Sequence, residues 1–260
     1  MTPTGSGAAE QPSPAATFVL TADLDWASEY CIEHFLSLAR RFSVRPTLFV
    51  THESAAARKA EDAGLAELAI HPNFLPGSSH GSTPDAVVDH VMRLVPAATV
   101  ARNHRYLDTP AIRAALAGRG LRYDSNAIRH LEAGLGPVRR EKGLLQLPVF
   151  FEDDVHWRDG LAWTFAAHSA AFFSAGLKIL NFHPFFVALN APDASFYERH
   201  KAYIPTLTAE EAASLRHPGA GAGTFLVETL AAIQAAGCRF VTLGELVGEN
   251  PAWQDGRAGR

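Results

Sequence analysis

The sequence predicts an α/β fold, a single-domain (β/α) barrel of seven to eight mostly parallel strands. Short runs rich in Val, Ile, Leu and Phe alternate with segments whose apolar residues recur at helical spacing. Several of the short runs are apolar on both faces, as strands covered by helices must be. About eight such strands in a chain of this length fall within the usual size range of a barrel.

The boundaries of the predicted elements follow from these patterns. Helices fit between the strands, as where Ile32, Phe35, Leu36 and Ala39 make one apolar stripe. Residues 17–247 make up the predicted barrel, and residues 1–16 and 248–260 are predicted to be flexible tails. The segments predicted as strands are residues 18–25, 46–51, 67–72, 99–104, 121–126, 144–153, 177–184 and 240–243.

The composition excludes several classes of function. With 47% hydrophobic and 19% charged residues and a formal net charge of -4, the chain has a core but no basic field for nucleic acid. No signal-peptide pattern and no apolar run of about 18 residues occurs, so we expect a cytoplasmic protein without a transmembrane segment. Cys31 and Cys238 lack the spacing of a metal site and are expected to be reduced thiols.

Polar side chains stand at the ends of five predicted strands. Because the carboxyl ends of parallel barrel strands converge on one face, we expect these side chains to form a single active site. They are Asp23 and Asp25, His71, Arg102 and His104, the run Glu152–Asp154, and His183.

Asp23 and Asp25 are the most informative of these residues. Alternate residues of a strand face the same side, and two neighbouring carboxylates repel each other unless a cation or a shared proton relieves them. Capping of a following helix could explain Asp25 alone but not both residues. His71 follows at another strand end, and the turn-rich loop after it could return His80 to the same centre.

One Asp and two His form a suitable ligand set for Zn²⁺ or a similar divalent ion. The sequence therefore predicts a metal site made by Asp25, His71 and His80. A loop histidine such as His80 is often only solvated, and His104 is then the next candidate for the third ligand.

Arg102 and His183 admit two readings each. Arg102 either pairs with an inward carboxylate or extends to the rim, and the unpaired Asp23 and Asp25 favour the first. His183 is either a core histidine or an acid catalyst whose pKa a carboxylate raises. Asp153 and Asp154 are both candidates for that carboxylate, with Asp154 taken as the catalytic one.

In its strand-end pattern the chain resembles the polysaccharide deacetylase (NodB-homology) superfamily. The resemblance runs in order through residues 17–247, over Asp23-Leu-Asp25, Glu67-Leu-Ala-Ile-His71-Pro, Arg102 and Leu180-Asn-Phe-His183. The stretch from His71 to Gly81 is similar to a divergent, WbmS-like branch associated with bacterial lipopolysaccharide and O-antigen gene clusters. The resemblance implies a distorted barrel.

The resemblance also implies residue roles and an activity. Asp23 would be the base, Arg102 would orient it, and Asp25 would bind one divalent ion, Zn²⁺ before Co, Ni, Fe or Mn. His183 would be the acid. The implied reaction is removal of an acyl group from an amino sugar or glycan. Hydrolysis of a non-sugar amide and a catalytically silent sugar-binding protein are the alternatives.

Overall fold

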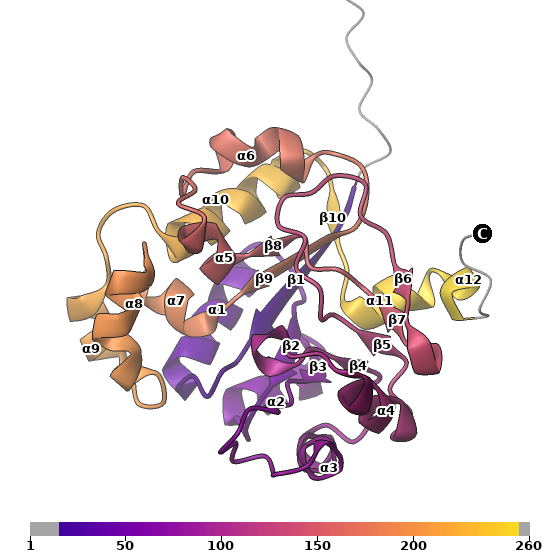
Figure 1. Cartoon of the computed structure of the whole chain (residues 1–260). Coiled ribbons are helices and arrows are strands. Elements are labelled where there is room, and N and C mark those ends of the chain that lie inside the picture. Colours follow the sequence, from indigo (N-terminus) through magenta and orange to yellow (C-terminus); the bar gives the residue numbers. More distant parts are fainter. Residues whose placement is uncertain (1–15, 255–260) are drawn as a thin grey trace, which may run out of the picture.

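The computed structural model describes residues 16–254, and its centre is a mostly parallel sheet (Figure 1). Strand β1 (Thr17–Asp23) pairs with β2 (Thr47–Val50) on one side and with β9 (Lys178–Phe182) on the other. Strand β10 (Arg239–Phe240) pairs with the first two residues of β1. In spatial order the strands are β6 (Val138–Arg139), β7 (Leu145–Gln146), β5 (Tyr123–Asp124), β4 (Val100–Ala101), β3 (Glu67–Ile70), β2 (Thr47–Val50), β1 (Thr17–Asp23), β9 (Lys178–Phe182) and β8 (Phe151–Glu152), with β10 (Arg239–Phe240) beside β1.

The two ends of this sheet meet in one stretch of chain. The stretch begins as β7, which pairs with β5, and ends as β8, which pairs with β9. Between them Val149 bridges to Ile128. Among the strands of residues 16–254, only β6 is antiparallel to its neighbour. The sheet therefore curls into a barrel whose closure depends on a single interrupted strand.

Helices cover the outside of this sheet (Figure 1). Several begin at a residue whose side chain accepts a hydrogen bond from the first turn, as Ser28, Ser54, Thr83 and Thr109 do. The helices are α1 (Glu29–Arg41), α2 (Ala55–Asp62), α3 (Pro84–Leu94), α4 (Pro110–Gly118), α5 (Asp153–Arg158), α6 (Phe165–Phe172), α7 (Pro184–Leu189), α8 (Ala194–His200), α9 (Ala209–Leu215), α10 (Ala222–Ala235), α11 (Leu243–Gly248) and α12 (Pro251–Gln254), with short 3-10 turns η1 (His104–Tyr106), η2 (Glu141–Gly143) and η3 (Lys201–Tyr203).

Alternation along the strands produces layers inside the barrel. Val19, Phe49 and Ile179 belong to a small apolar cluster separate from the main core. Two residues further along β1 and β9, Thr21 and Asn181 are buried and polar. Because side chains two apart in a strand share a face, the interior changes from apolar at the bottom to polar at the carboxyl end.

The predicted α/β barrel of mostly parallel strands is confirmed, with differences in detail. The single strand predicted at 144–153 is interrupted into β7 and β8, because its two halves pair with different neighbours. Strand β6 was not predicted. Helix α12 lies within the predicted C-terminal tail, and its Trp253 packs against the inner apolar cluster. The remainder of that tail, 255–260, and residues 1–15 lie outside the described residues.

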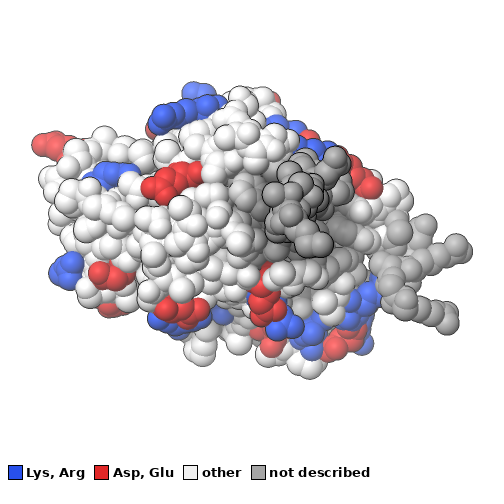
Figure 2. Space-filling model, turned by 90° about the horizontal axis from the view of Figure 1, so that it is seen from above, with Lys and Arg blue, Asp and Glu red and all other residues white. Residues whose placement is uncertain are grey.

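In the face shown in Figure 2, basic and acidic residues are intermixed and neither sign forms a large patch. Within residues 16–254, every helix is too short or too polar to cross a membrane.

Asn190 offers a test of the helical side of the fold. It ends α7 at φ 53° and is buried; its Nδ2 donates to the carbonyls of His217 and Gly219, at 3.0 and 2.7 Å, and its Oδ1 accepts from the Thr224 N–H at 2.9 Å. We expect Asn190→Ala to lower the free energy of unfolding by about 2–4 kcal/mol in urea titrations, through unpaired buried groups and a left-handed alanine. Asn190→Gly should lose about 1 kcal/mol less. An unchanged urea midpoint for the alanine variant would contradict this account.

Candidate active site

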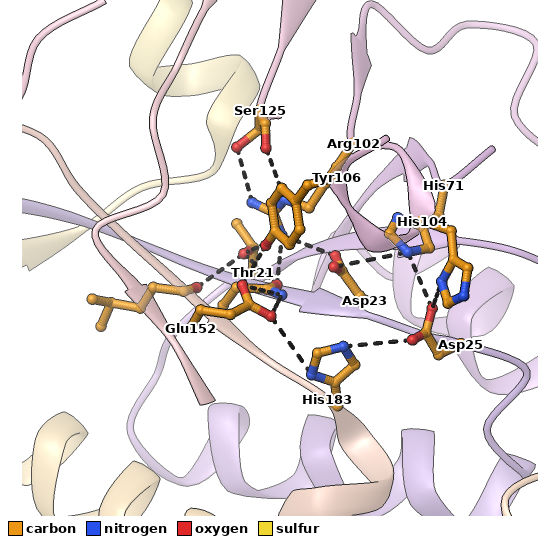
Figure 3. Close-up of polar contacts among 12 residues, drawn as sticks. Thr21, Asp23, Asp25, His71, Arg102, His104, Tyr106, Ser125, Glu152 and His183 are labelled. Atoms are coloured by element: carbon orange, nitrogen blue, oxygen red, sulfur yellow. Dashed lines mark hydrogen bonds and ion pairs between the residues drawn. The ribbon is translucent and has the colours of Figure 1, made fainter. Parts of the chain in front are cut away.

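The predicted strand-end residues meet at the carboxyl end of the barrel (Figure 3). Asp23 ends β1, His183 follows β9, and Arg102 directly follows β4. His71 directly follows β3 and is buried, while Asp25 stands in the turn after β1 at φ 45°. The parallel strands therefore deliver side chains far apart in sequence to one place.

Asp25, His71 and His104 form a compact group of possible metal ligands. The His71 Nε2 and His104 Nδ1 atoms lie 3.1 and 3.0 Å from the same oxygen, Oδ1 of Asp25. Burial alone would raise the pKa of Asp25, but hydrogen bonds from His104 and His71 hold that pKa well below its ordinary value. The potential ligand atoms of the three residues lie within 4.8 Å of one another. Two imidazoles and a carboxylate converging in this way fit a divalent ion with open positions.

The structure does not bring His80 into this group. Its Nδ1 accepts the N–H of Asn73 at 3.1 Å, so its proton is on Nε2, which donates to the Thr51 carbonyl at 2.9 Å. Burial and the nearby His90 lower the pKa of His80 to about 4, which keeps the ring neutral. Both ring nitrogens are thus used to fasten the loop after β3, and His104 takes the place that we expected for His80.

Asp23 is paired with Arg102 inside the barrel. The Arg102 side chain is fully buried, and its Nη1 donates to Asp23 Oδ1 at 2.9 Å. The same nitrogen donates to the Oδ1 of Asn181 at 2.5 Å, and the guanidinium lies 4.1 Å from the centre of the Phe49 ring. Burial opposes the charge of Arg102, but the attraction of Asp23 raises its pKa. Of the two sequence readings, the ion pair is therefore the one that the structure contains.

His183 is held by Asp153 and not by Asp154. The Asp153 carboxylate accepts from His183 Nδ1 at 2.6 Å and from the His183 backbone N–H at 2.7 Å. Burial alone would lower the pKa of His183, but the Asp153 carboxylate raises it well above its ordinary value. Asp154 is one residue further along α5 and does not contact His183. Its buried Oδ1 has no hydrogen-bond partner among the described residues.

Glu152 is a central residue that the sequence analysis left without a role. It is fully buried; its two carboxyl oxygens accept from Asn181 Nδ2 at 3.1 and 3.0 Å, and one of them also accepts from the Tyr106 hydroxyl. Burial, followed by repulsion from Asp154, raises the pKa of Glu152 well above its ordinary value. Asn181 therefore links Glu152 to Arg102 across the barrel. Period-two alternation from His183 and Asp154 could have identified both Asn181 and Glu152.

A second group, Asp23, Glu152 and His183, is also close enough to hold an ion. Its donor atoms, however, are already used: Arg102 contacts Asp23, the Asn181 amide donates to Glu152, and Asp153 contacts His183. A cation there would lie beside a guanidinium and an amide N–H. The electrostatics therefore favour the group around Asp25 as the metal site.

A cavity of about 590 Å³ is lined by the residues of both groups, Asp23, Asp25, His71, His104, Glu152 and His183. His183 Nε2 lies 3.5 Å from Asp25 Oδ2, and Asp23 Oδ2 lies 3.8 Å from His71 Nε2, so the two paired residues flank the group around Asp25. Beyond His183, the rings of Trp157 and Phe186 lie 4.4 Å apart and form an aromatic wall. The cavity thus combines a candidate metal site with a carboxylate on one side and a cationic imidazole on the other.

A comparison with known protein families shows to which family this chain belongs. Residues 20–201 match the model of the WbmS-like polysaccharide deacetylases. The chain belongs to this family. The resemblance inferred from the strand ends is therefore confirmed, and the matched segment includes every residue of the candidate active site.

Solved structures agree with this membership. One is a polysaccharide deacetylase described as involved in O-antigen biosynthesis, WbmS of Bordetella bronchiseptica: 28% identity, TM-score 0.74, 84% of this chain and 90% of that one. Two more distant structures share the fold alone. One is a family 4 esterase domain of a xylanase from the hindgut metagenome of Trinervitermes trinervoides, with 11% identity and a TM-score of 0.50 over 91% of this chain and 92% of that one. The other is a 4-alpha-glucanotransferase of Thermococcus litoralis, with 10% identity and a TM-score of 0.52 over 90% of this chain and 38% of that one. A comparison with curated proteins found no match.

The ligand set of this WbmS-like deacetylase can be tested by zinc titration. We expect about one Zn²⁺ per chain, and an affinity at least 10- to 100-fold weaker in Asp25→Ala, His71→Ala and His104→Ala. His80→Ala should keep the stoichiometry and lose thermal stability instead, because its two hydrogen bonds fasten a loop. The measurement is calorimetric titration of metal-free protein. Zinc loss in His80→Ala together with full binding in His104→Ala would return the third ligand to His80.

Proposed function

We propose that this chain is a metal-dependent hydrolase that removes an N-acyl group, acetyl or formyl, from an amino sugar of a bacterial surface polysaccharide or its precursor. Membership of the WbmS-like polysaccharide deacetylases supports the reaction class. The Bordetella bronchiseptica relative, which is described as involved in O-antigen biosynthesis, supports the choice of a surface glycan.

One observation carries the proposal: a base and an acid stand on either side of the metal-ligand group. Asp23 is held by Arg102 and lies 3.8 Å from His71, while His183 is held by Asp153 and lies 3.5 Å from Asp25. Hydrolysis of an amide needs both groups, because water must lose a proton and the leaving nitrogen must gain one.

Asp25, His71 and His104 would hold one divalent ion. Zn²⁺ suits a site with two imidazoles and one carboxylate, and Co, Ni, Fe and Mn are compatible with the same ligands. When bound, such an ion lowers the pKa of water and polarises the acyl carbonyl. Asp23 lies outside this ligand group, and because Arg102 engages its Oδ1, its Oδ2 is available to accept a proton.

The chain's own residues carry the proton transfers. Asp23 accepts a proton from the attacking water, and Arg102 keeps its carboxylate oriented. His183 donates from Nε2 to the nitrogen of the departing amino sugar, because its Nδ1 is fixed on Asp153. The raised pKa of His183, caused by Asp153 against the opposing effect of burial, keeps this proton in place before the reaction.

The direct test is release of acetate or formate from N-acyl amino sugars by zinc-loaded protein, followed by NMR. We expect turnover that stops on chelation and returns with metal. Turnover of simple amides but of none of the sugars would make the protein a hydrolase of non-sugar amides. Binding of sugars without any release would make it a catalytically silent sugar-binding protein.

Replacing Asp23 separates catalysis from metal binding. Asp23→Asn keeps an oxygen that can accept from Arg102 but cannot take a proton from water. We expect it to bind Zn²⁺ normally and to lose roughly two to four orders of magnitude in kcat, the usual contribution of a general base. Steady-state kinetics beside zinc titration check this. A variant with full metal and the normal rate would exclude Asp23 as the base.

Replacing His183 tests the acid. Without a proton donor an amine leaves slowly, whereas the phenoxide of an activated ester leaves unaided. We therefore expect His183→Ala to lose roughly 100-fold or more on an amide and much less on p-nitrophenyl acetate. Equal losses on the two substrates, together with a lowered melting temperature, would instead make His183 a core residue.

A further inference from the structure

The mouth of the catalytic cavity is cationic, although its floor is acidic. Arg105, from η1, Arg158, from the end of α5, and Lys201, from η3, all line the cavity. All three residues are exposed. The catalytic residues do not require them, since Asp23 is already paired with the buried Arg102.

These cations differ in how far they are neutralised. Lys201 pairs with Glu198 at 2.7 Å, and Arg158 has only a loose contact of 3.8 Å with Asp159. The Arg105 side chain makes no hydrogen bond or ion pair with any other residue in the range 16–254. Asp154, one helical turn before Arg158, does not pair with it either, so charge at the mouth remains uncompensated.

The backbone holds Arg105 at this mouth at some cost. Arg105 and Tyr106 have φ angles of 56° and 55°, in the left-handed region that side chains other than glycine avoid. The turn is fixed on both sides: the His104 N–H donates to the Pro72 carbonyl at 2.9 Å, and the Tyr106 hydroxyl donates to Glu152. Such strain persists where the surroundings over-determine it, often at ligand sites. The backbone that carries Arg105 is therefore held directly beside the candidate ligand His104, at the cavity.

We propose that the sugar substrate carries an anionic group, a carboxylate or a phosphate, bound at the mouth by Arg105 with Arg158. The proposal rests on the proposed function and names its substrate class. An anionic group deeper in the cavity would meet the carboxylates of Asp25 and Asp154, which line the interior and would repel it. With the acyl group at Asp25 and the leaving nitrogen at His183, the rest of the sugar faces the mouth. Planar guanidinium groups suit both carboxylate and phosphate oxygens.

Three sugars distinguish the sources of the negative charge. They are an N-acetylhexosamine, the corresponding N-acetylhexosaminuronic acid and the N-acetylhexosamine 1-phosphate, each offered to the zinc-loaded full chain. We expect KM to be roughly five- to fiftyfold lower for at least one anionic sugar, as a charge-assisted contact of this kind predicts. Which of the two is preferred identifies the group, and added salt should weaken that preference.

Arg105→Ala should remove most of this preference by raising KM for the preferred anionic sugar while kcat changes little, and Arg105→Lys should keep part of it. Arg93→Ala is the matched control, because Arg93 is an exposed arginine of α3 outside the cavity. Equal KM values for neutral and anionic sugars, or an Arg105→Ala loss that is the same for all three, would overturn the inference and leave deacetylation standing. If none of the three is hydrolysed, the proposed function fails, and calorimetric affinities of the same sugars still decide the inference.

Discussion

The buried charge of Arg102 is the constraint on which the site depends. A fully buried guanidinium needs a carboxylate and further acceptors, and losing the partner of such a pair costs about 3–5 kcal/mol. Asp23 and Asn181 supply these partners, and Thr21 accepts from the same nitrogen at 2.9 Å. The position of Asp23 is therefore set by the need to compensate the arginine and not by contacts at the cavity surface. Folding of the barrel and orientation of the proposed base depend on the same ion pair.

The same network reaches the acid side through one amide. The amide oxygen of Asn181 accepts from Arg102, and its amide nitrogen donates to Glu152, so one side chain joins a cation and a carboxyl group. An aspartate there could not donate to Glu152, and a leucine could neither donate to Glu152 nor accept from Arg102. Because Asn181 precedes His183 by two residues on the same strand face, the spacing of the proposed base and acid is tied to the width of the barrel between β4 and β9.

The sequence predicted those features that depend on strand periodicity alone. The alternation of strands and helices predicted the barrel. The convergence of Asp23, His71, Arg102 and His183 follows because parallel strands end at one face. The choices that it left open depend on tertiary geometry. Whether His80 or His104 reaches Asp25 is decided by a loop path, and whether Asp153 or Asp154 reaches His183 is decided by the phase at which α5 begins. No local pattern encodes either.

The short segment after β4 explains why His104 could take the place of a loop histidine. Arg102 is fixed inside the barrel, and His104, two residues later, contacts Asp25. Arg105 and Tyr106 are in the left-handed region and turn the chain back, so that the Tyr106 hydroxyl reaches Glu152. Arg102, the candidate metal ligand His104 and the mouth-facing Arg105 thereby lie within four residues of the chain. His80 instead accepts from the Asn73 N–H in its own loop and donates to the carbonyl of Thr51, directly after β2. A displacement of the segment after β4 would move the candidate ligand, the partner of Asp23 and Arg105 together, which is why its backbone strain can be retained.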